Sequence, residues 1–171
     1  PFTPRFHMPG RFQDRLNRAA GRAFVGRESE RNLFRGLVES EEPEYLVLLV
    51  YGPGGIGKSS LLRAFGRICN EVGAGSVHLD ARSFSDNPNA FKSALSTALG
   101  AGEAEDPLLV MAARPDRCAL LLGTYELCRD LQPCLLPEFL PALAANVVVV
   151  LARRHGPRPV STSEASDDPA V

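Results

Sequence analysis

YLVLLVYGPGGIGKSSLLRAF, residues 45–65, is the stretch that decides the fold of this chain. Its first seven residues are apolar at almost every position and rich in strand formers, as in a strand covered on both faces within a parallel sheet. From Leu61 to Val72, apolar residues recur at helical spacing, and the pattern ends near Gly73. The stretch therefore predicts a buried strand, a glycine-rich loop and an amphipathic helix in direct succession.

The loop between them, GPGGIGKS at Gly52 to Ser59, completes the pattern GxxxxGK[ST]. Glycines let successive backbone N–H groups turn inward around a β-phosphate, and the helix N-terminus adds its partial positive charge. Lys58 is expected to reach the β- and γ-phosphates, and the Ser59 hydroxyl to ligate Mg²⁺. The residues predicted to contact the nucleotide here are Gly52, Gly54, Gly55, Ile56, Gly57, Lys58, Ser59 and Ser60.

Two other interpretations of the same loop remain. Gly52, Gly54 and Gly57 also satisfy GxGxxG, and Asp80 ends the next predicted strand, as a dinucleotide-binding fingerprint requires. A dinucleotide loop has no use for a cation and a hydroxyl straight after its last glycine, whereas a triphosphate with Mg²⁺ uses both. A glycine-rich turn that binds nothing is the remaining alternative. We favour the triphosphate.

The rest of the chain alternates between strand and helix patterns. Alternation of this kind implies right-handed crossovers and a parallel, three-layer α/β sheet. Further strands are predicted at Ser76–Asp80, Cys118–Leu122 and Val147–Leu151, and helices at Glu28–Glu39, after the Asn87-Pro88 N-cap and within Tyr125–Ala145.

The two ends differ in composition from the middle. Residues 1–23 hold five arginines and three phenylalanines against one aspartate, and from Gly156 onward Pro, Ser and Asp dominate. We expect a basic N-terminal arm at 1–23, a nucleotide-binding domain at 24–155 and a disordered tail at 156–171. A solvated lead-in helix explains the charges of the arm without a ligand; docking to a nucleic acid or a partner is the alternative.

Composition narrows the class of protein. With 44% hydrophobic and 23% charged residues, the chain is expected to be a soluble, cytoplasmic globular protein. A net charge of −1 gives no global attraction to nucleic acid or to an anionic membrane, and no apolar run is long enough to span a bilayer. The four cysteines form no CxxC pair and are expected to be reduced core thiols, and the three histidines lack ligand-like spacing.

Residues flanking the loop resemble the STAND-class ATPases, AAA-like signalling NTPases that include NB-ARC. Phe24-Val25-Gly26-Arg27-Glu28 looks like the hhGRE motif of that family. The resemblance implies that Val25 and Gly26 line the base pocket and that Arg27 lies close to the nucleotide. A helix-start turn, with Glu28 favourable in the first turn, is the alternative.

A second motif departs from the family. Residues 119–126, ALLLGTYE, resemble the Walker B pattern hhhhDTYE, but Gly123 stands where the family carries the Asp that holds the Mg²⁺ shell. Without that carboxylate, Mg²⁺ is expected to bind more weakly and phosphoryl transfer to slow. Glu126 is expected either to orient or activate water or to be a solvated first-turn acid.

The last strand resembles the sensor-1 strand of the family. It runs from Val147 to Leu151 and is followed by Ala152-Arg153-Arg154, in which Arg154 aligns with the arginine that senses the γ-phosphate. An ordinary solvated arginine pair is the alternative. The family orders its strands 5-1-4-3-2, and only four strands are recognisable here. We therefore expect a P-loop NTPase fold that lacks its last strand and its C-terminal helical domains, cut from a longer protein.

The residues and the resemblance together favour an ATP-binding domain, with ATP/ADP and Mg²⁺, that serves as a nucleotide-dependent regulatory switch with weak hydrolysis. ATP is preferred over GTP because the chain has no guanine-specific N/TKxD sequence. A protein partner or self-association through the missing domains is expected. The alternatives are a small-molecule kinase, disfavoured by the roughly 44 residues before the first strand, and a non-catalytic docking or DNA-associated AAA-type module.

Overall fold

The structure, a computed structural model, describes residues 27–43, 46–102 and 105–156. The predicted arm at 1–23 and all but the first residue of the predicted tail at 156–171 lie outside these ranges. Within them, no helix is long and apolar enough to cross a membrane.

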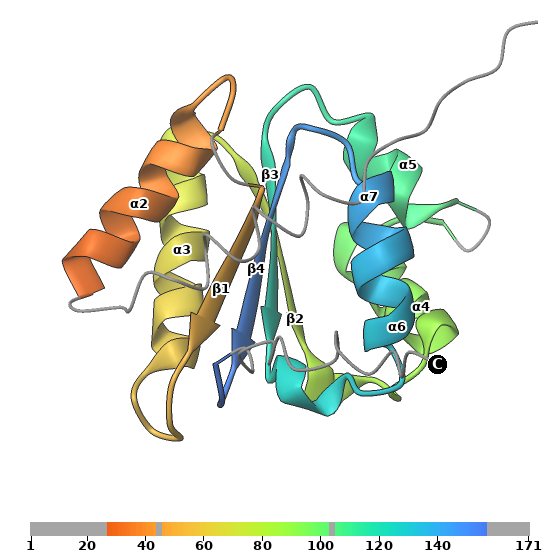
Figure 1. The fold of residues 1–171 in the computed structure, drawn as a ribbon. Helices are drawn as coiled ribbons and strands as arrows, with labels where there is room; N and C mark the ends of the chain where they lie inside the picture. The colour runs from red at the N-terminus through yellow and green to blue at the C-terminus, as the bar shows by residue number, and fades with distance from the viewer. Residues whose placement is uncertain (1–26, 44–45, 103–104, 157–171) are drawn as a thin grey trace, which may run out of the picture.

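Four parallel strands form the sheet, in the order β1-β4-β3-β2. This order is the one expected for the four recognisable strands, and the prediction of a parallel α/β fold is confirmed. Three of the strands, β1, β3 and β4, are nearly continuous runs of apolar residues because helices cover both faces of the sheet (Figure 1). The strand β2 instead alternates between buried and exposed residues. Their bounds are β1 Val47–Tyr51, β2 Gly75–Asp80, β3 Cys118–Gly123 and β4 Val147–Arg153.

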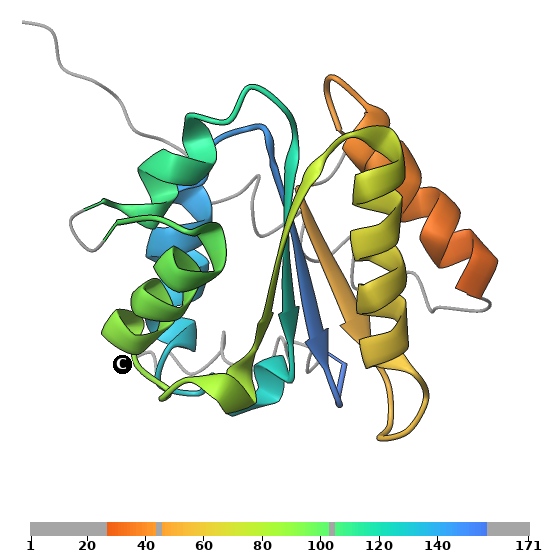
Figure 2. The same cartoon turned by 180° about the vertical axis from the view of Figure 1, so that it is seen from behind.

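Helices α2 and α3 cover one face of the sheet, and α4, α5, α6 and α7 cover the other, as both opposite views show (Figures 1 and 2). Two predicted helix boundaries are confirmed: Asn87 caps α4 through the Ala90 N–H, and Gly73 ends α3 in a left-handed conformation. The helix bounds are α2 Arg27–Glu39, α3 Lys58–Val72, α4 Pro88–Leu99, α5 Pro107–Ala112, α6 Gln132–Cys134 and α7 Leu140–Ala142.

Each face of the sheet has its own apolar core. On one face, Phe34 of α2 stacks on Phe65 of α3 with ring centroids 4.1 Å apart, and both side chains are fully buried. Alternate residues of β3 divide between the faces: Leu121 packs under α2 and α3, whereas Leu120 packs under α4. The sheet is therefore held between two helical layers, with its strand ends left free for loops.

The predicted helical region at Tyr125–Ala145 is more broken than expected. It begins with a 3₁₀ turn at Tyr125–Leu127 and continues as α6, a π-helical turn at Leu135–Phe139, and α7. Three prolines, at positions 133, 137 and 141, lie in the part of this region that follows the 3₁₀ turn. Because proline has no N–H to donate, a regular i to i−4 ladder cannot run through the segment.

Candidate nucleotide-binding site

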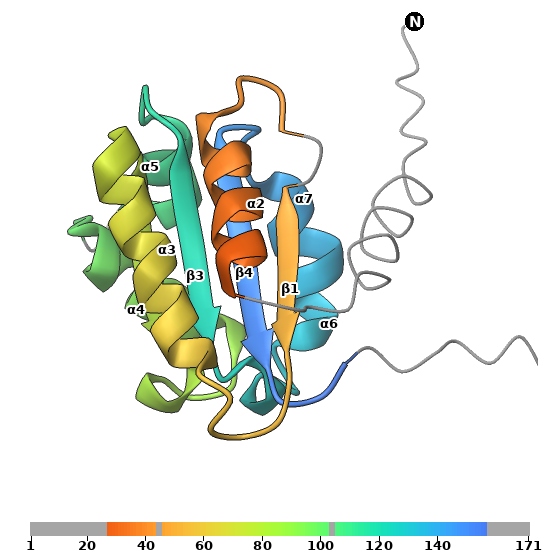
Figure 3. The same cartoon turned by 90° about the vertical axis from the view of Figure 1, so that its left-hand side faces the viewer.

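The glycine-rich loop lies at the carboxyl ends of the strands, where ligands bind in open α/β sheets. It leaves β1 at Tyr51 and enters α3 at Lys58, next to the end of β4 (Figure 3). The Gly52 N–H donates to the Arg153 carbonyl at 3.3 Å, which fastens the start of the loop to β4. The tip from Pro53 to Ile56 is exposed, so its backbone is accessible to a ligand.

Position 57 requires a glycine for two reasons, its backbone conformation and the side chain that lies against it. Its backbone is left-handed, with φ 93° and ψ 23°, and a Cβ there would overlap the Arg27 guanidinium. Arg27 donates from Nη2 to the Ile56 carbonyl at 3.1 Å. The first residue of α2 thus lies against the loop, whereas Val25 and Gly26, predicted to line the base pocket, lie outside the described residues.

Lys58 folds back over the beginning of the loop. Its Nζ donates to the Gly52 carbonyl at 2.6 Å and to the Pro53 carbonyl at 2.9 Å. The ammonium group is therefore held by the loop that it is predicted to complete. Ser59 and Ser60 follow at the exposed N-terminus of α3, where free N–H groups and the helix dipole favour an anion.

Gly123 ends β3 at the same edge of the sheet and is buried. A Cβ at this position would lie 3.5 Å from Leu62 Cδ1 and 3.9 Å from Asp80 Oδ2, both ordinary contact distances. A side chain therefore fits at position 123, facing α3. Thr124 follows in a left-handed conformation, φ 57°, and is the only non-glycine residue with positive φ within the described ranges. Such a conformation is strained for a β-branched residue.

Glu126 and Arg154, which the sequence predicts as catalytic, contact each other. Arg154 Nε lies 3.2 Å from Glu126 Oε1, and the side chains are 64% and 21% exposed, respectively. Glu126 Oε2 is buried and has no hydrogen-bond partner among the described residues. The glutamate is therefore not a freely solvated first-turn acid, and its second oxygen is available to a water or another donor.

Asp80 also lies at this edge, and the sequence alone assigned it no role at a triphosphate site. It ends β2 beside Gly123, its partner in the parallel register. Arg82 donates from Nε to Oδ1 at 3.0 Å and from Nη2 to Oδ2 at 2.6 Å. These bonds to the Arg82 side chain are the main cause that lowers the pKa of Asp80 to about 2. Only the pairing of β2 with β3 reveals that Asp80 is a neighbour of position 123.

The side-chain oxygens at this edge of the sheet suit a Mg²⁺ ion that is held mainly by phosphates. No group of three or more His, Cys, Asp or Glu residues that would hold a metal by itself exists in the part of the chain described here. Mg²⁺ in nucleotide sites keeps several waters and uses one or two protein oxygens besides the phosphates. The exposed Ser59 and the ionised Asp80 supply oxygens of the required type, so the residues fit the ion.

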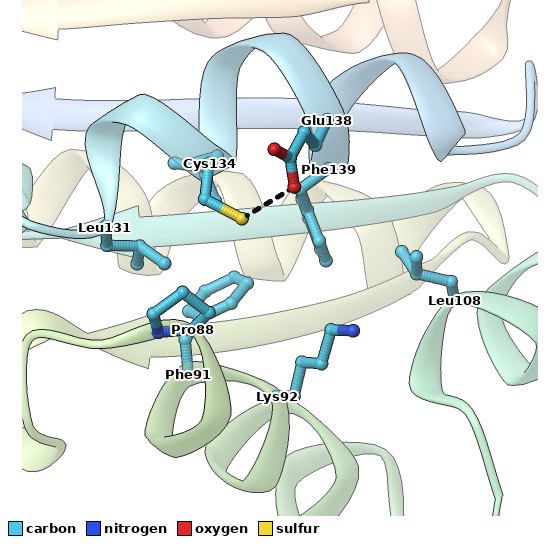
Figure 4. Close-up of a pocket in the computed structure, with 9 residues that line it drawn as sticks. Pro88, Phe91, Lys92, Leu108, Leu131, Cys134, Glu138 and Phe139 are labelled. Carbon is cyan, nitrogen blue, oxygen red and sulfur yellow. Dashed lines mark hydrogen bonds between the residues drawn. The ribbon is translucent and has the colours of Figure 1, made fainter.

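A small cavity lies elsewhere, between α4, α5 and the segment from α6 to Phe139 (Figure 4). Its volume is about 110 Å³, and Cys134 donates there from Sγ to Glu138 Oε2 at 3.1 Å. The cavity is on the face of the sheet opposite α3, so it is not part of the phosphate site. Its lining residues are Pro88, Phe91, Lys92, Leu108, Leu131, Cys134, Leu135, Glu138 and Phe139.

A small-molecule kinase would need a lid that carries arginines, and the candidates in the sequence are Arg114 and Arg117, just before β3. Both are remote from the loop. Arg117 donates to the carbonyls of Glu41 and Ala145, and Arg114 lies beside Gly75, the first residue of β2. Both arginines are therefore at the amino-terminal edge of the sheet, opposite the glycine-rich loop. This placement does not support the kinase alternative.

The comparisons with known proteins agree with this geometry. A family model described as "AAA ATPase domain" matches residues 23–165. Among solved structures, the chain is similar to Cdc6p from Pyrobaculum aerophilum, with a TM-score of 0.53 and 15% sequence identity. That match covers 81% of this chain and 43% of the Cdc6p chain, so this chain corresponds to less than half of that protein. A comparison with curated proteins finds no match.

Proposed function

Because the chain belongs to the AAA ATPase domain family, we propose that it is an ATP-dependent regulatory switch of the STAND type that hydrolyses ATP weakly. One observation carries the proposal: the glycine-rich loop begins after Tyr51, the register partner of Arg153, and the next residue along, Arg154, pairs with Glu126. The nucleotide-binding unit is residues 24–155, and a protein partner or a second copy reads its state.

Binding depends on the loop and on the first turn of α3. Backbone N–H groups of residues 54–59 surround the β-phosphate, and Lys58 exchanges its carbonyl partners for phosphate oxygens. Arg27 lies against Gly57 and thereby holds α2 close to the nucleotide. Mg²⁺, when bound, neutralises negative charge on the β- and γ-phosphates.

Weak hydrolysis follows from two features of the site. Position 123 carries no carboxylate. In addition, Arg154 pairs with one oxygen of Glu126 and so occupies part of the carboxylate that is proposed to activate water. The buried second oxygen, Oε2, is the atom that accepts a hydrogen bond from that water.

The switch is the exchange of partners by Arg154. Its guanidinium is 64% exposed and lies just after β4, so a γ-phosphate competes with Glu126 for it. When Arg154 turns to the phosphate, Glu126 and the strained turn that begins at Thr124 lose their anchor to β4. The release of γ-phosphate restores the ion pair.

Binding is tested by titrating the full chain with a fluorescent ATP analogue and with ADP. Lys58→Ala should weaken binding at least tenfold, because the ammonium contributes a charge-assisted contact of about 1.5–3 kcal/mol. Lys92→Ala is the matched control: it removes the only other lysine, which lies on α4 at the opposite face. If the wild type does not bind at millimolar nucleotide, or if both variants bind equally well, the proposal is wrong.

The switch is tested by amide hydrogen exchange with ATP bound and with ADP bound. Residues 124–128 should exchange faster with ATP, since their contact to Arg154 is then lost, whereas β3 at 118–122 serves as the unchanged reference. Equal exchange at 124–128 in the two states would contradict the partner exchange without affecting the conclusion on binding.

A further inference from the structure

Position 123 lacks a carboxylate, but a carboxylate lies beside it. Asp80 and Gly123 are register partners at the ends of β2 and β3. Val77 and Leu79 pack in the core under α4, so Asp80 alternates onto the face covered by α3. A Cβ at position 123 points to the same face, because its nearest neighbour is Leu62 of α3, one turn after Lys58.

We propose that Asp80 supplies the carboxylate that position 123 lacks, and that it accepts hydrogen bonds from the hydrated Mg²⁺ of a bound Mg·ATP. This inference rests on the proposed function, since it requires that the loop bind a triphosphate. It assigns to β2 an oxygen ligand that the Walker B resemblance places on β3.

The carboxylate of Asp80 lies close to the position that the side chain of residue 123 would occupy. Asp80 Oδ2 is 3.9 Å from the position of a Cβ at residue 123, so an aspartate at 123 would bring a second carboxylate next to that of Asp80. A glycine at 123 therefore leaves room for the Asp80 carboxylate instead of competing with it. Direct ligation is not needed, because Mg²⁺ keeps several of its waters and accepts carboxylates through them.

The surroundings of Asp80 keep it charged and oriented. Arg82 binds both carboxylate oxygens, and the Arg82 N–H donates to Oδ1 at 3.0 Å. A hydrogen bond from Thr124 also helps to hold the pKa of Asp80 low. Thr124 adopts its strained left-handed conformation next to position 123, and strain of this kind persists where the surrounding structure requires it. The Asp80 side chain is 33% exposed, so water can reach its carboxylate.

The first test compares ATP affinity with Mg²⁺ and with a chelator, using a fluorescent ATP analogue and the full chain. Asp80→Asn should reduce the ratio of the two affinities 10- to 100-fold, as the loss of an outer-shell ligand does, and leave the affinity in chelator unchanged. Asp116→Asn is the matched control, since it removes the same charge just before β3, at the opposite edge of the sheet. Gly123→Asp added to Asp80→Asn should restore the ratio.

The outcomes separate this inference from the proposed function. If the wild type binds no nucleotide, the proposed function fails. If the wild type binds and Asp80→Asn keeps the full effect of Mg²⁺, the inference alone is overturned. A second measurement needs no variant: Mn²⁺ with ATP should broaden the carboxyl carbon resonance of Asp80 and leave that of Asp116 sharp. Equal broadening of the two resonances would also overturn it.

Discussion

Three alanine substitutions in the loop separate the reasons why its glycines are required. Gly54 has no positive φ, and a Cβ there would meet no atom of the described residues within 4 Å. Gly55 has φ 79° but equally open surroundings. Gly57 has φ 93°, and a Cβ there would overlap Arg27, with the guanidinium carbon 3.0 Å away. Substitution by alanine therefore adds no free-energy cost at Gly54, a backbone cost at Gly55, and both a backbone and a steric cost at Gly57.

The magnitudes follow from these two costs. A left-handed conformation costs an alanine about 1–2 kcal/mol, so Gly55→Ala should lower the free energy of unfolding by that amount. Gly57→Ala should cost a further ~1 kcal/mol, because Arg27 must give up its hydrogen bond to Ile56. Gly54→Ala should stay within about 0.5 kcal/mol of the wild type. For a chain of this size, each kcal/mol corresponds to roughly 2–4 °C in Tm.

Urea unfolding of the full chain, followed by circular dichroism, measures all three variants. The steric part is isolated in an Arg27→Ala background, in which Gly57→Ala and Gly55→Ala should cost the same. Equal stability of the three single variants would refute the argument from φ. A difference between Gly57→Ala and Gly55→Ala that persists without Arg27 would refute the argument from contact.

Three further predictions concern the rest of the chain. Phe34→Ala should cost about 3–5 kcal/mol in urea unfolding, because Phe34 is fully buried and stacked on Phe65; a loss below 1 kcal/mol would contradict this packing. Asp80 has a folded pKa of about 2, below its ordinary 3.8, so its ionised form stabilises the fold above about pH 4 and this contribution is lost as the pH falls toward 2. The difference in unfolding free energy between the wild type and Asp80→Asn should shrink over that range, from at most about 1 kcal/mol because Arg82 is exposed; a constant difference would contradict it. Cys134 is the only one of the four thiols that is not buried, so it should react first with a thiol reagent, while the others react only on unfolding; simultaneous reaction of all four would contradict the assignment.

Much of the fold was predictable because its signals are local. The apolar run before the glycines, the helical stripe after them and the cap at Asn87 each depend on neighbours only a few residues apart. The observed strands differ from the predicted ones by two residues or fewer at each end. The region after Tyr125 was less predictable, because three prolines divide it between different helical hydrogen-bond patterns, and the sequence pattern does not distinguish these.

The contacts of the candidate site join residues that are far apart in the sequence. Arg27 meets Gly57 across 30 residues and Glu126 meets Arg154 across 28, so neither distance follows from spacing along the chain. The sequence predicted that Glu126 and Arg154 are functional residues, but it did not predict that they contact each other. For the same reason, it did not predict that Asp80 lies next to position 123.

By itself, the sequence determined the four strands, the longer helices and the position of the glycine-rich loop, because hydrogen-bonding periods and glycine conformations are properties of short stretches. Only the tertiary structure decided which side chains share the edge of the sheet. Crossover helices bring distant strands into register, and that register places Asp80 next to Gly123. Interactions between strand ends depend on this pairing, which no short stretch of sequence encodes.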